Sequence, residues 1–151
     1  MAQSLSKIYV HLVFHIKSTS TSIRDEDLPR LFANIGAIIN ASGSQVLKVG
    51  GMGDHVHALF LLSKSESISS MVDKIKCNSC NWLKQYDARY RKFAWQGGYA
   101  AFSVSQSVVN ATMSYIERQP EHHAKRSFQE EYIAFLKLYG IQYDDKYVFA
   151  D

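Results

Sequence analysis

Residues 44–62 read SQVLKVGGMGDHVHALFLL, and this stretch predicts a β-hairpin. Two β-rich runs, 44–49 and 55–62, flank a turn that contains three glycines, and short apolar runs joined in this way are typical of paired strands. Side chains two residues apart on a strand point to the same face, so His55 and His57 should project together. Two imidazoles on one face of a rigid strand could bind one metal ion.

The segments around this hairpin alternate between strand and helix. Residues 8–16 alternate in hydrophobicity, which predicts a half-buried strand, and residues 25–42 carry apolar side chains at helical spacing after a first-turn Pro29. Downstream, residues 67–86 predict a second amphipathic helix and residues 99–104 a fourth strand. The order predicts an α+β fold, a ferredoxin-like (RRM-like) βαββαβ antiparallel sheet with helices on one face. The other face is expected to stay available.

Two more helices are predicted after the last strand. Residues 105–119 keep helical spacing and are expected to stop at Pro120, and residues 127–139 open with a capping-box sequence. On the first of these helices, Tyr115 and Gln119 lie one turn apart on a stripe beside the apolar one. We therefore expect both side chains to face away from the core.

The bulk composition limits the class of protein. The chain has 151 residues, 46% hydrophobic and 21% charged, which fits one globular domain over residues 1–151. No apolar stretch is long enough to span a membrane and no signal-peptide layout is present, so we expect a cytoplasmic protein. Cys77 and Cys80 form a lone C-x-x-C with no second pair to complete a zinc site, and we expect free thiols.

A local excess of positive charge suits a polyanionic partner. The formal net charge is only +3, but six of the 17 basic residues fall within residues 71–92, where they interleave with aromatic residues. Such a segment could supply phosphate contacts and stacking surfaces for nucleic acid, or it could be a solvated lysine face above core aromatics. The candidate DNA-binding residues are Lys74, Lys76, Lys84, Arg89, Arg91 and Lys92, together with His11 on the first strand.

Two sequence runs resemble one known family. The run from Gly53 to His57 resembles the HUH motif, in which U is a hydrophobic residue. The run from Tyr115 to His123 resembles the nucleophile helix of single-tyrosine HUH transposases, the TnpA family of small bacterial insertion sequences that includes the REP-associated tyrosine transposases. The resemblance extends to residues 11–14, 95–99 and 140–144, and so covers nearly the whole chain in the same order.

This resemblance implies a DNA transposase that cleaves and rejoins single-stranded DNA through a 5′-phosphotyrosine intermediate and recognises hairpins at element ends. It implies that Tyr115 is the nucleophile. It also implies that His55, His57 and Gln119 bind a divalent metal, magnesium or manganese. A homodimer is implied as well, in which the tyrosine helix of one subunit could complete the metal site of the other.

Two other functions stay open at the level of sequence. A non-catalytic RRM-like nucleic-acid-binding module has the same architecture, although residues 55–60, His-Val-His-Ala-Leu-Phe, lack the glycine and aromatic signature of an RRM strand. A metal-dependent phosphoesterase could use the histidines with a water nucleophile, but it would leave Tyr115 without a role. Taken singly, a tyrosine on a helix flank is most often a packing residue.

Overall fold

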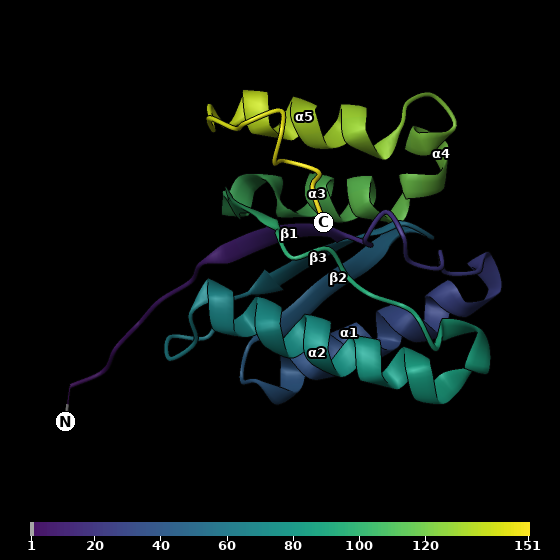
Figure 1. The fold of residues 1–151 in the computed structure, drawn as a ribbon. Coiled ribbons are helices and arrows are strands. Elements are labelled where there is room, and N and C mark those ends of the chain that lie inside the picture. Colours follow the sequence, from purple (N-terminus) through teal and green to yellow (C-terminus); the bar gives the residue numbers. More distant parts are fainter. Residues whose placement is uncertain (1) are drawn as a thin grey trace.

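The computed structural model describes residues 2–151 and places the sheet between two layers of helices (Figure 1). Short 3-10 turns precede α1, follow α2 and precede α3. Within the described residues, no helix is both long and apolar enough to cross a membrane. The elements are β1 (Tyr9–His15), α1 (Leu28–Ala41), β2 (Gln45–Met52), β3 (His55–Leu61), α2 (Ile68–Tyr86), β4 (Ala100–Val104), α3 (Val109–Glu117), α4 (Gln119–His123) and α5 (Phe128–Leu138).

The four strands form an antiparallel sheet in the order β2-β3-β1-β4. The predicted α+β, ferredoxin-like βαββαβ fold is therefore confirmed, including the β2–β3 hairpin. The central strands β1 and β3 pair with Val13 opposite His57 and His15 opposite His55. This register places the two histidines of the hairpin beside the odd-numbered residues of β1.

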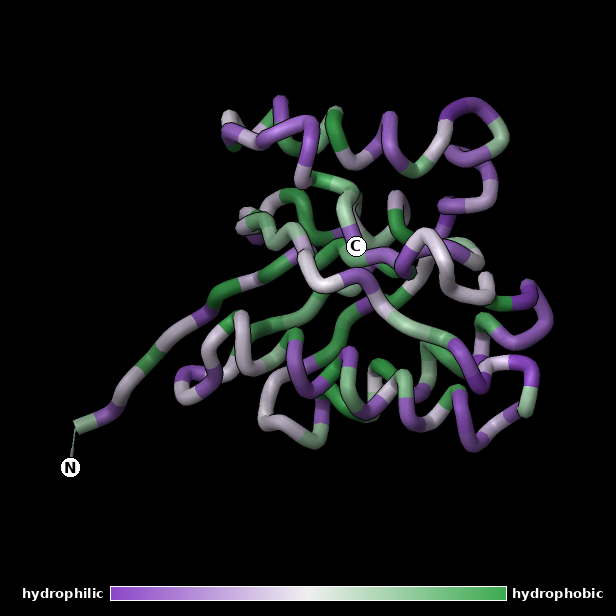
Figure 2. Tube along the Cα trace, in the orientation of Figure 1, coloured by the Kyte–Doolittle hydropathy of each residue, from purple (hydrophilic) through white to green (hydrophobic). Residues whose placement is uncertain are grey.

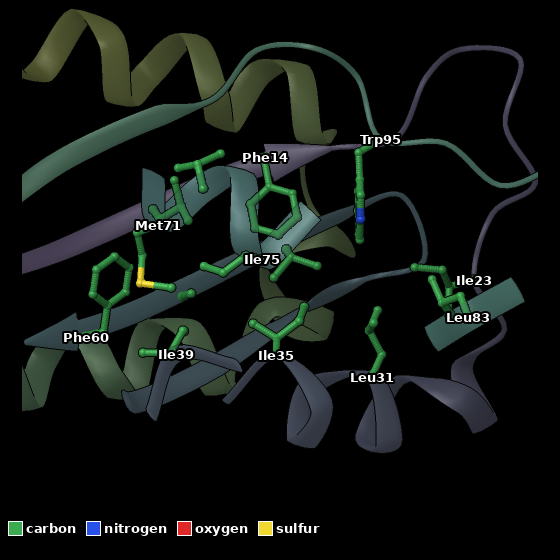
Figure 3. Packing of buried hydrophobic residues seen from close by; sticks show 14 of the residues in the cluster. Phe14, Ile23, Leu31, Ile35, Ile39, Phe60, Met71, Ile75, Leu83 and Trp95 are labelled. Carbon is green, nitrogen blue, oxygen red and sulfur yellow. The ribbon is translucent and has the colours of Figure 1, made fainter. Parts of the chain in front are cut away.

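The main core lies between the sheet and the α1–α2 layer. Alternation along β1 sends Val10, Leu12 and Phe14 to this face, where they are buried with the inner stripes of both helices. Figure 3 shows Phe14 of β1 with Ile35 of α1 and Ile75 of α2 between the strands and the helices. Figure 2 shows hydrophobic residues along the strands in the middle of the molecule and hydrophilic residues along the outer loops.

The second face of the sheet is also covered, so the expectation that it stays available was wrong. Helix α3 packs on β2 and β3, and α5 lies on the same side of the sheet, against β1 and β4 (Figure 1). The reason is the apolar stripe of α5, because Phe128, Tyr132 and Leu136 are buried by packing against Val13 and β4. All odd-numbered residues of β1 from His11 onward are consequently buried.

The helix predicted for residues 105–119 is broken into α3 and α4 at Arg118. Pro120 lies in the first turn of α4 instead of ending a helix, because a proline there lacks only an N–H that would have no helical partner. Gln119 thus begins a new helix and is fully buried, and Tyr115 is half-buried. The expectation that both side chains face away from the core was wrong.

Candidate active site

All six histidines of the chain lie in the layer between the sheet and the C-terminal helices. The four histidines on strands share the face opposite the α1–α2 core, because they occupy alternate positions. Helix α4 brings the remaining two over them, with the ring of His123 centred 4.5 Å from that of His55. The set comprises His11 and His15 on β1, His55 and His57 on β3, and His122 and His123 on α4.

Three fully buried residues at the start of β3 and on α5 could hold a metal ion. His55, His57 and Glu131 each offer a ligand atom, and these atoms all lie within 4.8 Å of one another. Glu131 Oε1 is 2.9 Å from His57 Nε2 and 3.7 Å from His55 Nε2. Two imidazole nitrogens and a carboxylate oxygen form a donor set suited to divalent transition metals.

The hydrogen bonds of His55 show that a cation fits this group. Asp54 Oδ1 lies 2.7 Å from His55 Nδ1, so this nitrogen carries a proton and donates it to the carboxylate. His55 Nε2 then faces Gln119 Oε1 at 2.8 Å, and the amide orientation is set because Gln119 Nε2 donates to Glu131 Oε2 at 3.0 Å. A nitrogen lone pair and an oxygen at this distance require a second proton on the ring or a metal ion beside them.

His11 orients His57 from below. His11 Nε2 lies 2.8 Å from His57 Nδ1, and only 3% of His11 is exposed. Burial, together with the neighbouring His57, lowers the pKa of His11 to about 3, so His11 is neutral. When His57 Nε2 donates to Glu131, a neutral His11 donates to His57 Nδ1. His11 can instead accept from His57 Nδ1, which would leave His57 Nε2 free to bind a cation. Contact of His11 with DNA stays a prediction, because its side chain is buried between the sheet and the C-terminal helices.

Tyr115 points from α3 toward the same carboxylate. Its hydroxyl donates to Glu131 Oε2, and its ring centre lies 5.9 Å from that of His57. Burial, and then the bond to Glu131, raises the pKa of Tyr115 to about 12. Burial alone would raise the pKa of Glu131, but hydrogen bonds from His57, Tyr115 and Gln119 outweigh it and hold this pKa below its ordinary value. The resting pair is a neutral phenol beside a carboxylate.

Glycines of the hairpin allow α3 to approach closely enough for this contact. A Cβ on Gly50 would lie 2.5 Å from the backbone oxygen of Ile116, the residue after Tyr115. Gly51 has a φ of +147°, and a Cβ there would lie 2.3 Å from the backbone oxygen of His55. The end of β2, which leads into the histidine strand, therefore also allows the helix that carries the tyrosine to pack closely.

The structure brings together all four residues predicted for the catalytic and metal site, namely Tyr115, His55, His57 and Gln119, although the roles assigned to them stay predictions. Sequence reasoning missed Glu131, which lies between Phe128 and Phe135 on the buried side of α5. An acidic residue at that spacing was the available signal. His123 also belongs to the cluster, with Nε2 2.9 Å from Gln119 Oε1 and 3.3 Å from Glu131 Oε1.

The predicted DNA-binding side chains of residues 71–92 belong to the opposite side of the sheet, on α2 and just after it. Lys76 differs from the others because it is partly buried, and its ammonium donates to the backbone oxygens of Gln96 at 2.7 Å and Gly98 at 2.6 Å. Lys74 pairs with Glu66 at 2.7 Å. Contact with DNA stays a prediction for all of them, and the exposed ones are Lys74, Lys84, Arg89, Arg91 and Lys92.

The aromatic residues of the same segment are divided between core and surface. Tyr90 and Phe93 are fully buried and cannot stack on bases, whereas Trp82 and Tyr86 are partly exposed and stack on each other with centres 4.9 Å apart. The alternative of a solvated lysine face above core aromatics therefore holds for Tyr90 and Phe93. The nearby Cys77 and Cys80 are free, as expected.

Comparisons with known proteins agree with this fold. A family model described as "Transposase IS200 like" matches residues 4–119. A solved Deinococcus radiodurans R1 protein, assigned as a transposase, superposes with a TM-score of 0.60 at 21% identity and covers 79% of this chain and 98% of its own. A REP-associated tyrosine transposase bound to a REP hairpin gives 0.58 at 12% identity, covering 82% and 74%. No curated protein sequence matches the chain.

Proposed function

The chain belongs to the family of IS200-like transposases, and we propose that it cleaves and rejoins single-stranded DNA with Tyr115 as the nucleophile. The observation that carries this proposal is the convergence of Tyr115 with two histidines, Gln119 and Glu131 in one buried cluster. A tyrosine that served only in packing would not need its hydroxyl directed at a group that can hold a metal.

We propose that His55, His57, Gln119 and Glu131 hold a divalent ion. Two imidazoles favour manganese over magnesium, which prefers oxygen ligands, although either could serve. When bound, such an ion would polarise the scissile phosphate and, as a positive charge beside Tyr115, favour the phenolate.

The residues of the chain would carry the remaining steps. The Tyr115 oxygen forms a bond to phosphorus, and the bond from phosphorus to the 3′ oxygen breaks, which leaves a 5′-phosphotyrosine and a 3′-hydroxyl. The phenol proton passes along its hydrogen bond to Glu131 Oε2 and from there to solvent, and the departing 3′ oxygen takes up one proton from solvent, so that the step neither gains nor loses a proton. Attack by another 3′-hydroxyl reverses these changes and joins a new strand without external energy.

The same arrangement favours action in cis. Tyr115 reaches Glu131 and lies over His57 of its own chain, so one chain supplies every residue of the cluster. A homodimer with exchanged tyrosine helices stays a prediction of the family resemblance. An RRM-like module that reads nucleic acid on its open sheet is disfavoured, because α3 and α5 cover that face.

A covalent-adduct assay tests the proposal. The protein is incubated with Mn²⁺ and single-stranded oligonucleotides that contain hairpins, labelled at either the 5′ or the 3′ end, and run on a denaturing gel. We expect the 3′ label to migrate with the protein and the 5′ label to appear in a shorter free strand. Tyr115→Phe should abolish both products, and the control Tyr147→Phe, at an exposed position, should not.

Two outcomes would contradict this function. Cleavage that persists in Tyr115→Phe would indicate a phosphoesterase with a water nucleophile. Binding of the oligonucleotides without any cleavage by the wild-type protein would indicate a binding module. Hairpin recognition is tested in the same assay by replacing the hairpin with an unpaired sequence of equal length, which should lower the adduct yield.

A further inference from the structure

A cavity of about 360 Å³ opens beside Tyr115, between α3 and α5. Tyr115 forms part of its wall, whereas the residues of the metal cluster do not line it. The cavity is therefore adjacent to the proposed nucleophile but separate from the proposed metal position. Its volume is near the lower end of the range for small-ligand pockets, roughly 300–1,000 Å³, which suits one nucleoside better than two.

The lining of this cavity is mainly apolar and aromatic, and it includes His11 of β1. Helix α3 contributes Ala111, α5 contributes Ala134 and Phe135, and Tyr139 follows directly after α5. Phe135 and Tyr139 are held in place from behind, because both rings stack on Phe102 of β4 with centres 5.4 Å and 4.6 Å away. Preset aromatic rings of this kind are the surfaces on which single-stranded bases stack.

The mouth of the cavity exposes large apolar side chains to solvent. Val108 is 47% exposed, Leu138 78% and Tyr139 43%, and all three line the same cavity. Scattered exposed apolar residues are ordinary, but a group around a hollow indicates a binding site. A planar aromatic ligand would cover these side chains when it enters.

One wall also carries a positive charge. Arg126, on the loop between α4 and α5, lines the cavity together with Tyr115. A guanidinium beside the nucleophile is suited to hold the phosphate that the nucleophile attacks. The ligand that combines a phosphate at Tyr115 with a flat ring in the cavity is a nucleotide.

We propose that the cavity holds the base of a nucleotide that flanks the scissile phosphate, while Arg126 contacts that phosphate. This inference rests on the proposed function, because it assigns the cavity to the strand that Tyr115 attacks. The site would add a base-dependent step at the cut itself, beyond any recognition of a hairpin. The position of the phosphate would then be fixed from both sides, by the base in the cavity and by the metal cluster.

Removal of single bases from the substrate tests the proposal. A series of cleavable oligonucleotides carries one abasic position each, stepped across the cut site, and the rate of adduct formation is measured for the wild-type protein. We expect removal of the base at one of the two positions that flank the cut to lower the rate about tenfold, which is the size of one lost base stack. Positions further from the cut, outside the hairpin, should change the rate much less.

Filling the cavity provides a matched test that does not depend on cleavage. In a Tyr115→Phe background, the affinity for intact and abasic oligonucleotides is measured by fluorescence anisotropy. Ala111→Leu, and Ala134→Leu as a second variant, should weaken binding of intact DNA about tenfold and remove the difference between intact and abasic strands. The control Ala37→Leu, at an exposed position of α1, should bind as the parent does. Arg126→Gln should weaken both strands equally.

The outcomes separate this inference from the proposed function. If the adduct forms at the same rate whichever base is removed, the base pocket is overturned, but the role of Tyr115 as nucleophile is not. Loss of the adduct for every substrate would overturn the proposed function, and the anisotropy series would then decide the pocket alone. If both filled variants keep their thermal stability and still bind intact DNA as the parent does, the cavity holds no base.

Discussion

Glu131 is the residue on which the electrostatics of the site depend. A fully buried carboxylate is costly unless its oxygens are paired, and here His57, Tyr115 and Gln119 all direct polar atoms at it. The motif-based residues were predictable because strand alternation fixes His55 and His57 on one face. Glu131 was not, because its place in the site depends on α5 folding back over the sheet.

Replacing this carboxylate should weaken metal binding. Glu131→Gln keeps the size of the side chain but removes its charge, so we expect the affinity for Mn²⁺ in calorimetric titration to fall by at least about tenfold. Glu121→Gln, at an exposed position of α4, makes the same chemical change away from the cluster and should leave the affinity unchanged. Equal affinities in the two variants would remove Glu131 from the ligand set.

His15 should make the folded protein sensitive to acid. Burial, and then the positive charge of Lys76, lowers the pKa of His15 to about 4, and its Nδ1 has no hydrogen-bond partner. The unfolded chain has a histidine pKa of about 6.5, so between these values it binds a proton that the folded chain does not. Stability from this residue is therefore complete above about pH 6.5 and is lost as the pH falls toward about 4.

A phenylalanine at this position should remove the effect. His15 lies against Phe128, Tyr132 and Phe149, so the ring of His15→Phe fits an aromatic surrounding. We expect the free energy of unfolding, measured with urea, to depend less on pH between about 4.5 and 6, by up to about 1.4 kcal/mol per pH unit. The two proteins should keep a constant difference above pH 7. Parallel pH profiles throughout would show that folding does not lower the pKa of His15.

At the scale of the elements, the strands and most helices follow from local patterns. The hydrophobic periods of 2 and 3.6 residues locate β1 to β4, α1, α2 and α5 to within a few residues, because the core face of each element repeats regularly. The break between α3 and α4 does not follow from a local pattern. It depends on the burial of Gln119 against the histidines, which is a tertiary contact.

The close packing of α3 on β2 leads to a prediction for Gly50. Gly50→Ala would place a methyl group 2.5 Å from the backbone oxygen of Ile116, so the helix must move outward. We expect a loss of about 1–3 kcal/mol in unfolding free energy, as for other overpacked sites, and a lower rate of adduct formation because Tyr115 moves with the helix. Gly97→Ala is the control, since a Cβ there meets nothing within 4 Å. Unchanged stability in Gly50→Ala would show that α3 is not held against this strand.

At the scale of the whole molecule, the sheet separates the proposed active site from the basic residues of 71–92. The proposed active site lies between the sheet and α3–α5, whereas the basic residues of 71–92 lie on the side of α2. A DNA molecule that touches both must pass around the edge of the sheet. The sequence could not show this separation, because it depends on which face each helix covers.

The separation predicts that binding and chemistry respond to different substitutions. Lys84→Glu combined with Arg91→Glu should weaken binding of hairpin oligonucleotides and lower the salt dependence of log Kd by roughly two units, one for each lost phosphate contact. The adduct rate on short unstructured strands at saturating concentration should not change. Lys7→Glu with Lys64→Glu makes the same change of net charge elsewhere. Equal losses in both pairs would indicate only a general charge effect.

Identification of the modified residue tests the central claim most directly. The protein is incubated with Mn²⁺ and cleavable single-stranded DNA, the DNA is trimmed with nuclease, and tryptic peptides are sequenced by mass spectrometry. Trypsin releases residues 93–118, which contain both Tyr99 and Tyr115. We predict a nucleotide phosphate on Tyr115. A nucleotide on Tyr99 or on any other residue, or cleaved DNA with no modified peptide, would contradict the proposed mechanism.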